Sequence, residues 1–209
     1  MSSLVKTIHF GDKVFNICED VYEPAEDSFL FAENLDVQKG AEVLDVGTGS
    51  GFLAILAAEN AKNVLALDLN PYAIPCARAN AALNFVENKI GFMQASLLTT
   101  LNSKAKFDLI LFNAPYLPSE AHEIESWIGR SWAGGVNGRE VIDRFIIQVT
   151  AHLKFCGRVL LMQSTLTGVE ETINNFVACN LCASVKAEKK LPFFETLTLI
   201  EAKFSNAHQ

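Results

Sequence analysis

The chain has 209 residues, half of them hydrophobic by count, and a formal net charge of −7. A chain of this length can bury one substantial core, so we expect a single domain over residues 1–209. The acidic balance argues against a basic groove for nucleic acid. Because neither a membrane span of ~20 apolar residues nor a signal peptide is visible, we expect a cytoplasmic protein with no membrane partner.

Short apolar segments alternate with helical segments, which predicts an α/β fold with a mostly parallel sheet. A short N-terminal hairpin, residues 5–10 and 14–18, is expected within residues 1–20 and outside the core, which occupies residues 21–209. The expected core strands are 42–46, 63–68, 89–94, 107–113, 158–162, 183–189 and 196–203. The expected helices are 25–35, 51–58, 71–83, 138–153 and 168–179. The last two strands are so close in sequence that we expect an antiparallel C-terminal hairpin at one edge of the sheet.

The first core strand ends at Asp45 and Val46 and runs into a glycine-rich turn. Ligands bind outside the carboxyl ends of parallel strands, and Gly47, Gly49 and Gly51 let the backbone turn tightly beside one. The G-x-G-x-G spacing suits the methionine end of S-adenosylmethionine better than a pyrophosphate. Asp68 ends the next strand, where it can accept both ribose hydroxyls. An NAD site also places an acid there, so Asp68 alone does not discriminate.

Ser96 and Leu97 follow the third core strand. Many enzymes of this fold carry Asp at the position of Ser96, where it accepts a bond from the adenine amino group. Ser96 can accept that bond without a charge, and the backbone N–H of Leu97 can meet a ring nitrogen. A serine in an ordinary surface loop is the alternative, which the sequence leaves open.

The fourth core strand ends in Asn113-Ala114-Pro115-Tyr116. The side-chain oxygen of Asn113 and the carbonyl of Ala114 can accept two N–H bonds from an amide or an exocyclic amine. The ring of Tyr116 can pack on the flat group that carries this amine. These four residues therefore predict methyl transfer to a planar nitrogen, and a dehydrogenase has no use for them.

Two more segments, residues 21–30 (VYEPAEDSFL) and 131–145 (SWAGGVNGREVIDRF), flank these motifs. Together the four segments resemble the short eukaryotic and archaeal branch of the HemK-type release-factor glutamine methyltransferases. The resemblance implies a Rossmann-like class I methyltransferase fold and an activity that depends on S-adenosylmethionine. It also implies N5-methylation of the glutamine in the Gly-Gly-Gln motif of a class 1 peptide-chain release factor, and an obligate small zinc-binding activator subunit. Ala114 is a departure, because the family usually shows proline there.

The flanking segments supply further candidate site residues. The resemblance implies that Asp27 and Ser28 close over the site, one facing substrate and the other facing cofactor. Helix capping is the alternative for both residues. Tyr22 is a third candidate from the same segment, on the substrate side. Trp132 and Asn137 lie in a glycine-rich loop that can cover a peptide substrate, with the start of a helix as the simpler interpretation of Asn137.

Other polar residues give weaker signals. Arg139 is expected on a polar face, in an ion pair with Glu140 or Asp143. The histidines His9, His122, His152 and His208 share no ligand spacing, so we expect neither a catalytic histidine nor a metal site. The cysteines, Cys18, Cys76, Cys156, Cys179 and Cys182, form no disulfide framework and suit reduced thiols.

Three functions stay open at this point. The favoured one is methylation of a glutamine in a release factor. The second is methylation of adenine N6 or guanine N2 in nucleic acid, because enzymes of that kind grip a flipped base with related loops. The third is a partner-binding scaffold without catalysis.

The chain contains 15 phenylalanines, a heavy apolar load for its size. We expect part of this load to stay exposed along the strand at 89–94, where Ile90 and Phe92 receive the activator by strand addition. The alternative is that these side chains fill the core.

Overall fold

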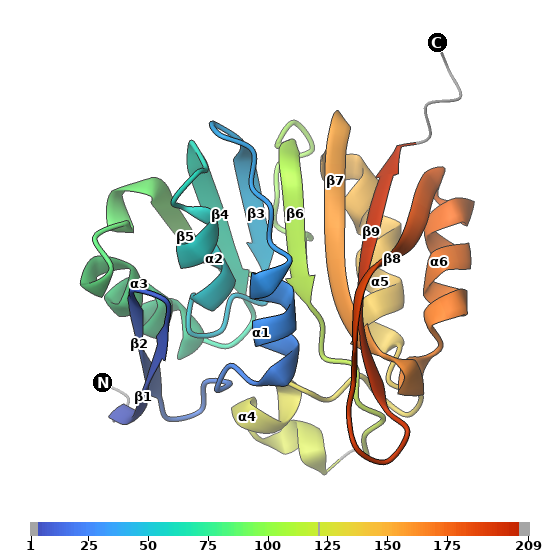
Figure 1. Ribbon diagram of the computed structural model, residues 1–209, viewed down its shortest axis with the longest axis horizontal. Coiled ribbons are helices and arrows are strands. Elements are labelled where there is room, and N and C mark those ends of the chain that lie inside the picture. Colours follow the sequence, from blue (N-terminus) through green and yellow to red (C-terminus); the bar gives the residue numbers. More distant parts are fainter. Residues whose placement is uncertain (1–3, 121, 205–209) are drawn as a thin grey trace.

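The computed structural model describes residues 4–120 and 122–204. Its main sheet consists of β3 (Glu42–Val46), β4 (Asn63–Asp68), β5 (Ile90–Gln94), β6 (Phe107–Asn113), β7 (Leu153–Ser164), β8 (Leu181–Lys190) and β9 (Thr196–Phe204). The strands lie in the order β5-β4-β3-β6-β7-β9-β8 (Figure 1). β9 runs antiparallel to both of its neighbours, β7 and β8, whereas the first five strands in this order are parallel to one another. The predicted seven-stranded sheet with an antiparallel hairpin at one edge is confirmed.

Helices cover both faces of this sheet because the central strands are apolar on both sides. On β6, Leu109 and Leu111 join one core cluster, while Ile110 and Phe112 join a second cluster on the opposite face. The first cluster includes side chains of α1 (Glu26–Glu33), α2 (Phe52–Ala57) and α3 (Ala73–Leu83). The second includes side chains of α5 (Glu140–Val149) and α6 (Val169–Ala178). Among the described residues, no helix has the length and apolar character needed to cross a membrane.

The remaining elements are short. They are α4 (Trp127–Arg130) and the 3₁₀ turns η1 (Glu87–Lys89), η2 (Glu123–Glu125), η3 (Thr150–His152) and η4 (Thr165–Thr167). The helix expected to run to residue 153 ends as α5 at Val149 and continues as η3. The strand expected at 158–162 is longer, because β7 already pairs with β6 at Leu153, across an irregularity in the ladder.

The N-terminal hairpin forms as predicted, from β1 (Leu4–Phe10) and β2 (Lys13–Cys18), but it does not lie outside the core. Phe15 is fully buried in the first core cluster and Ile17 lies beside it. Asn80 on α3 and Asn84, the C-cap of this helix, accept bonds from the backbone of β2 at 2.8 and 3.0 Å. The expectation was wrong because β2 has an apolar face, which α3 and α2 cover.

The expected apolar edge at β5 is also corrected. β5 is an edge strand, but Ile90 is buried and Phe92 is half-buried beneath the guanidinium of Arg78, 5.2 Å from the ring centroid. The strongly exposed phenylalanines of the described chain are instead Phe85, Phe155, Phe193 and Phe194. They lie in turns and at the start of β7, so strand periodicity did not reveal them.

Candidate functional site

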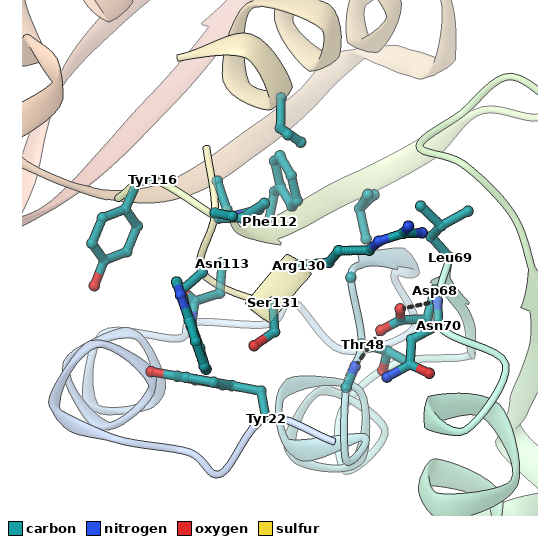
Figure 2. A pocket seen from close by; sticks show the side chains of 18 of the residues that line it. Tyr22, Thr48, Asp68, Leu69, Asn70, Phe112, Asn113, Tyr116, Arg130 and Ser131 are labelled. Carbon is teal, nitrogen blue, oxygen red and sulfur yellow. Dashed lines mark hydrogen bonds between the residues drawn. The ribbon is translucent and has the colours of Figure 1, made fainter. Parts of the chain in front are cut away.

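A cavity of about 690 Å³ opens at the carboxyl ends of β3, β4 and β6. β3 lies at the switch point of the sheet, because it pairs with β4 on one side and with β6 on the other. Figure 2 shows Asp68 and Asn70 on one side of this cavity and Asn113 and Tyr116 on the other. The strands thus bring the two predicted halves of the site together.

The glycine-rich turn forms one wall. Gly47 and Gly49 adopt left-handed backbone angles, with φ of 69° and 55°, and a side chain at Gly49 meets nothing within 4 Å. A ligand can therefore approach the backbone closely here. Gly51 is different: it does not line the cavity, and it begins α2 where an added Cβ lies 3.0 Å from Ala77. Its role is the close packing of α2 on α3.

Two buried carboxyl groups stand beside this turn. Burial raises the pKa of Asp45 to about 7, opposed by the Thr48 hydroxyl that donates at 2.7 Å and assisted by the charge of Asp68. Burial also raises the pKa of Asp68, while backbone N–H groups of Asn70 and Gly49, both at 2.8 Å, lower it. Neither carboxylate has an ion-pair partner within the described residues. The pair therefore suits a ligand that offers a cation and hydroxyl groups.

Ser96 and Leu97 also line the cavity, as expected. Both are half-buried, and Leu97 adopts a left-handed backbone with φ of 51°. The loop is held from both sides, since Ala95 donates to the Asp68 carbonyl at 2.8 Å and Leu98 donates to Gln148 at 3.1 Å. The tertiary fold therefore gives this loop a fixed course along the cavity.

The amide of Asn113 has one fixed orientation. Its Nδ2 donates to Asp27 Oδ2 at 3.0 Å and to Ser28 Oγ at 3.2 Å. Because a carboxylate only accepts, the NH₂ group must face Asp27 and the Oδ1 atom must face away. Oδ1 is buried and has no partner within the described chain. Asn113 lines the cavity, and its Oδ1 is an oriented acceptor without a partner among the described residues, next to the buried Ala114.

Asp27 organises this half of the site. Its Oδ1 accepts the backbone N–H of Ser28 at 2.6 Å within the first turn of α1, but the N-cap of this helix is Ala25, so Asp27 is not its cap. Its carboxylate also accepts from the hydroxyls of Tyr22, at 3.1 Å, and Tyr116, at 3.5 Å. Burial raises the pKa of both tyrosines and the charge of Asp27 raises it further, so both hydroxyls remain donors. Asp27 thereby ties the N-terminal segment to the loop after β6.

The glycine-rich loop before α5 contributes only in part. Trp132 lines the cavity, and its carbonyl accepts the backbone N–H of Leu117 at 2.9 Å. Asn137 does not line the cavity; its side chain is exposed and accepts the backbone N–H of Arg139 at 3.1 Å. The simpler interpretation of Asn137, the start of a helix, matches this geometry.

The sequence predicted that Arg139 lies on a polar face, but the residue is buried. The residue is 3% exposed, and its guanidinium pairs with Asp143 at 2.7 Å and with Glu171 at 3.2 Å. It also donates to the Thr167 carbonyl. The ion pair with Asp143 is confirmed, but the residue joins α5 to α6 inside the protein.

Metal ligation receives no support from the part of the chain that is described, where no group of three potential ligands comes together. His208 lies outside the described residues. Cys179 is the half-buried C-cap of α6.

The sequence interpretation missed several cavity residues. They are Thr48, Asn70, Ser119, Glu120, Arg130, Ser131, Glu140 and Arg144. Asn70 is the one that the sequence could have revealed most readily, because Asn before Pro at the end of a strand is typical of an Asx turn. Its Oδ1 accepts from Tyr72 at 2.9 Å, and its Nδ2 donates to the carbonyl of Asp20.

Known proteins share both the sequence and the fold. The family model of ribosomal protein L11 methyltransferase (PrmA) matches residues 27–115. A putative protein N5-glutamine methyltransferase of Methanocaldococcus jannaschii is 43% identical over 182 residues, which cover 86% of this chain and 90% of that protein. The chain belongs to the protein N5-glutamine methyltransferases. This N5-glutamine methyltransferase therefore uses a methyl donor, and the resemblance inferred from its motifs is confirmed.

Two further similarities extend this assignment. Methyltransferase HEMK2 of Homo sapiens is 40% identical over 66% of this chain and 67% of its own length. One chain in the solved structure of the E. cuniculi Mtq2–Trm112 complex superposes on this protein with a TM-score of 0.71 at 25% identity. The superposition covers 89% of this protein and 99% of the solved chain. That complex is described as responsible for the methylation of the eRF1 translation termination factor.

Proposed function

We propose that this chain transfers a methyl group from S-adenosylmethionine to the side-chain nitrogen of a glutamine in a class 1 peptide-chain release factor. The target is the glutamine of the Gly-Gly-Gln motif. The similarity to the eRF1-methylating complex supports this substrate. The cytoplasmic location inferred from the sequence stays a prediction.

One observation carries the proposal, the oriented and unpartnered Oδ1 of Asn113. A glutamine side chain ends in an NH₂ group, which offers two donors in one plane. Asn113 Oδ1 accepts one of them and the carbonyl of Ala114 accepts the other. Buried polar atoms almost always have a partner, so an acceptor prepared in this way indicates a donor that arrives with the substrate.

The other half of the cavity fits S-adenosylmethionine. Asp45 lies at the glycine-rich turn and suits the positively charged amino group of the methionine end. Asp68 suits the two ribose hydroxyls, and Ser96 with the N–H of Leu97 suits the adenine edge. The turn leaves open space at Gly49 for a closely approaching ligand. The cofactor supplies an electrophilic methyl group on a sulfonium.

The chain's own residues compensate for a poor nucleophile. An amide nitrogen has its lone pair delocalised into the carbonyl, so both its position and its charge must be controlled. Asn113 and Ala114 fix the nitrogen with its lone pair toward the methyl group, which lowers the entropy cost of reaction. Their oxygens also stabilise the positive charge that grows on nitrogen, before one N–H proton is released to solvent. Tyr116 packs on the flat amide, and Asp27 holds Asn113 in place.

The proposal includes a small zinc-binding activator subunit. The Mtq2–Trm112 complex supports a partner of this kind, and the zinc follows from the family resemblance. β5 is the free edge on the side away from the C-terminal hairpin, and Gly91 and Met93 are exposed there. The partner adds a strand to this edge through backbone bonds. Since Ile90 is buried, edge hydrogen bonding replaces the apolar patch as the main basis for docking.

A methyl-transfer assay tests the proposed function. The chain, co-expressed with the activator, is offered tritiated cofactor together with purified release factor, transfer RNA or DNA in separate reactions. We expect label only in the release factor, and none when its Gly-Gly-Gln glutamine is replaced by alanine. Label in nucleic acid supports the amino-methyltransferase alternative, and no label in any acceptor supports a scaffold.

A further inference from the structure

The turn between β8 and β9 presents two phenylalanines to solvent. It comprises residues 192–195, and the relative exposure of Phe193 and Phe194 is 96% and 103%. Both adopt left-handed backbone angles, with φ of 61° and 66°. The turn is closed by a backbone bond from Leu191 to Glu195 at 2.8 Å. The two phenylalanine side chains therefore project from a hydrogen-bonded turn and do not pack against the core.

This choice of residues is unfavourable for folding. Two successive left-handed positions define a turn that strongly prefers Asn-Gly. A bulky residue in this region is strained, and an exposed aromatic ring gains no burial energy in return. Folding alone therefore does not explain Phe193 and Phe194, whereas contact with another molecule does.

The turn lies near Tyr116 of the cavity, although none of residues 192–195 lines the cavity itself. Leu191 packs against the same core cluster as Tyr116. Lys189, at the end of β8, pairs with Glu26 on the helix that carries Asp27 and Ser28. Burial and Asp27 raise the pKa of Tyr116, and the nearby charge of Glu195 raises it further. In Figure 1 the turn reaches past the carboxyl ends of the parallel strands, at the end of the molecule where α4 lies.

The rim of the cavity has a matching chemistry. Ile124 and Val136 line the cavity, yet they are 44% and 86% exposed. The exposed charges of the cavity are mixed, with Glu120 and Glu140 set against Arg130 and Arg144. The turn therefore shares its apolar character with the rim, and apolar contact is what it offers a protein surface.

We propose that the turn 192–195 is a docking site for the methyl-acceptor protein, which contacts it outside the segment that carries the target glutamine. The inference rests on the proposed function and deepens it. The nearness of Glu195 to Tyr116 favours the acceptor as the partner. The activator is proposed to dock at β5, which lies at the opposite edge of the sheet from the β8–β9 hairpin. The acceptor therefore binds at two places, with its glutamine at Asn113 and with its apolar surface at the turn.

The test replaces Phe193→Asn together with Phe194→Gly, the pair that this turn prefers. The fold is therefore retained, and the melting temperature stays equal or rises. With the activator present, we expect the KM for the intact release factor to rise about tenfold or more, with kcat unchanged. The KM for a short Gly-Gly-Gln peptide stays the same, since the peptide does not reach the turn. Phe155→Ser is the matched control, because Phe155 is an exposed aromatic residue at the opposite end of the sheet.

Each outcome bears on a separate claim. If the unaltered enzyme methylates the release factor and the double variant keeps its KM within twofold, the docking proposal is wrong. It is also wrong if the KM values for the peptide and for the release factor rise equally. It is wrong as well if the double variant loses affinity for the activator, or if sedimentation shows that it has lost a self-associated state. If the unaltered enzyme does not methylate the release factor, the proposed function fails and the docking proposal fails with it.

Discussion

The two halves of the cavity are assembled in different ways. The half with Asp45 and Asp68 is built from consecutive strands, and its main contacts span at most 19 residues: Thr48 to Asp45, and Gly49 and Asn70 to Asp68. The half with Asn113 depends on Asp27, 86 residues away in sequence. The local half therefore forms with the sheet, whereas the distant half needs the N-terminal segment in place. Variants in the two halves should separate cofactor binding from methyl transfer.

The largest effect is expected for Asn113→Ala. It removes the acceptor that orients the substrate nitrogen, and loss of one such preorganised group costs about 10²–10³ in kcat. Cofactor affinity, measured by calorimetry, should change little because Asp45 and Asp68 are untouched. A variant that loses cofactor binding and transfer together contradicts the separation of the two halves.

Asp68→Ala probes the local half. We expect it to weaken cofactor binding by about 1.5–3 kcal/mol, the value of a hydrogen bond to a charged group. The KM for the release factor should stay near its original value at saturating cofactor. Calorimetry supplies the affinity, and a thermal melt controls for the lost bonds to Gly49 and Asn70. Unchanged affinity in a folded variant removes Asp68 from the cofactor site.

Asp45→Asn tests the electrostatics of the same half. Burial raises the pKa of Asp45 to about 7, so between about pH 4 and 7 the folded state binds more protons than the unfolded state. Its contribution to stability is present at low pH and is lost as the pH rises through 7. Relative to the asparagine variant, the unmodified chain should lose about 1 kcal/mol per pH unit between pH 5 and 7. Denaturant melts without cofactor measure this difference, and parallel pH curves count against it.

The smallest effect is expected for Ala114→Pro. Pro115 already biases Ala114 toward an extended backbone, and the carbonyl that accepts the substrate N–H is retained. Activity should stay the same or rise slightly as the loop stiffens. A large loss of kcat shows that this loop follows a different path from that of the proline-bearing relatives.

The sequence predicted the features that depend on local chemistry. Strand β3, the glycine-rich turn and the Asn-Ala-Pro-Tyr segment were visible because periodicity and residue type specify them within a few residues. Gly51 and Asn137 satisfied the same motifs but do not line the cavity. A motif fixes the course of the backbone, and it does not fix which of its residues face a ligand.

The sequence by itself determined the parallel sheet, the place of the cavity at its carboxyl end, and the type of nitrogen that the site is suited to hold. Only the tertiary structure decided that Asp27 orients the side-chain amide of Asn113, that Arg139 is buried between two helices, and that β2 belongs to the core. The physical reason is that strand and turn formation follow nearest neighbours. The orientation of an amide or the burial of a charge depends on groups that meet only after the chain has folded.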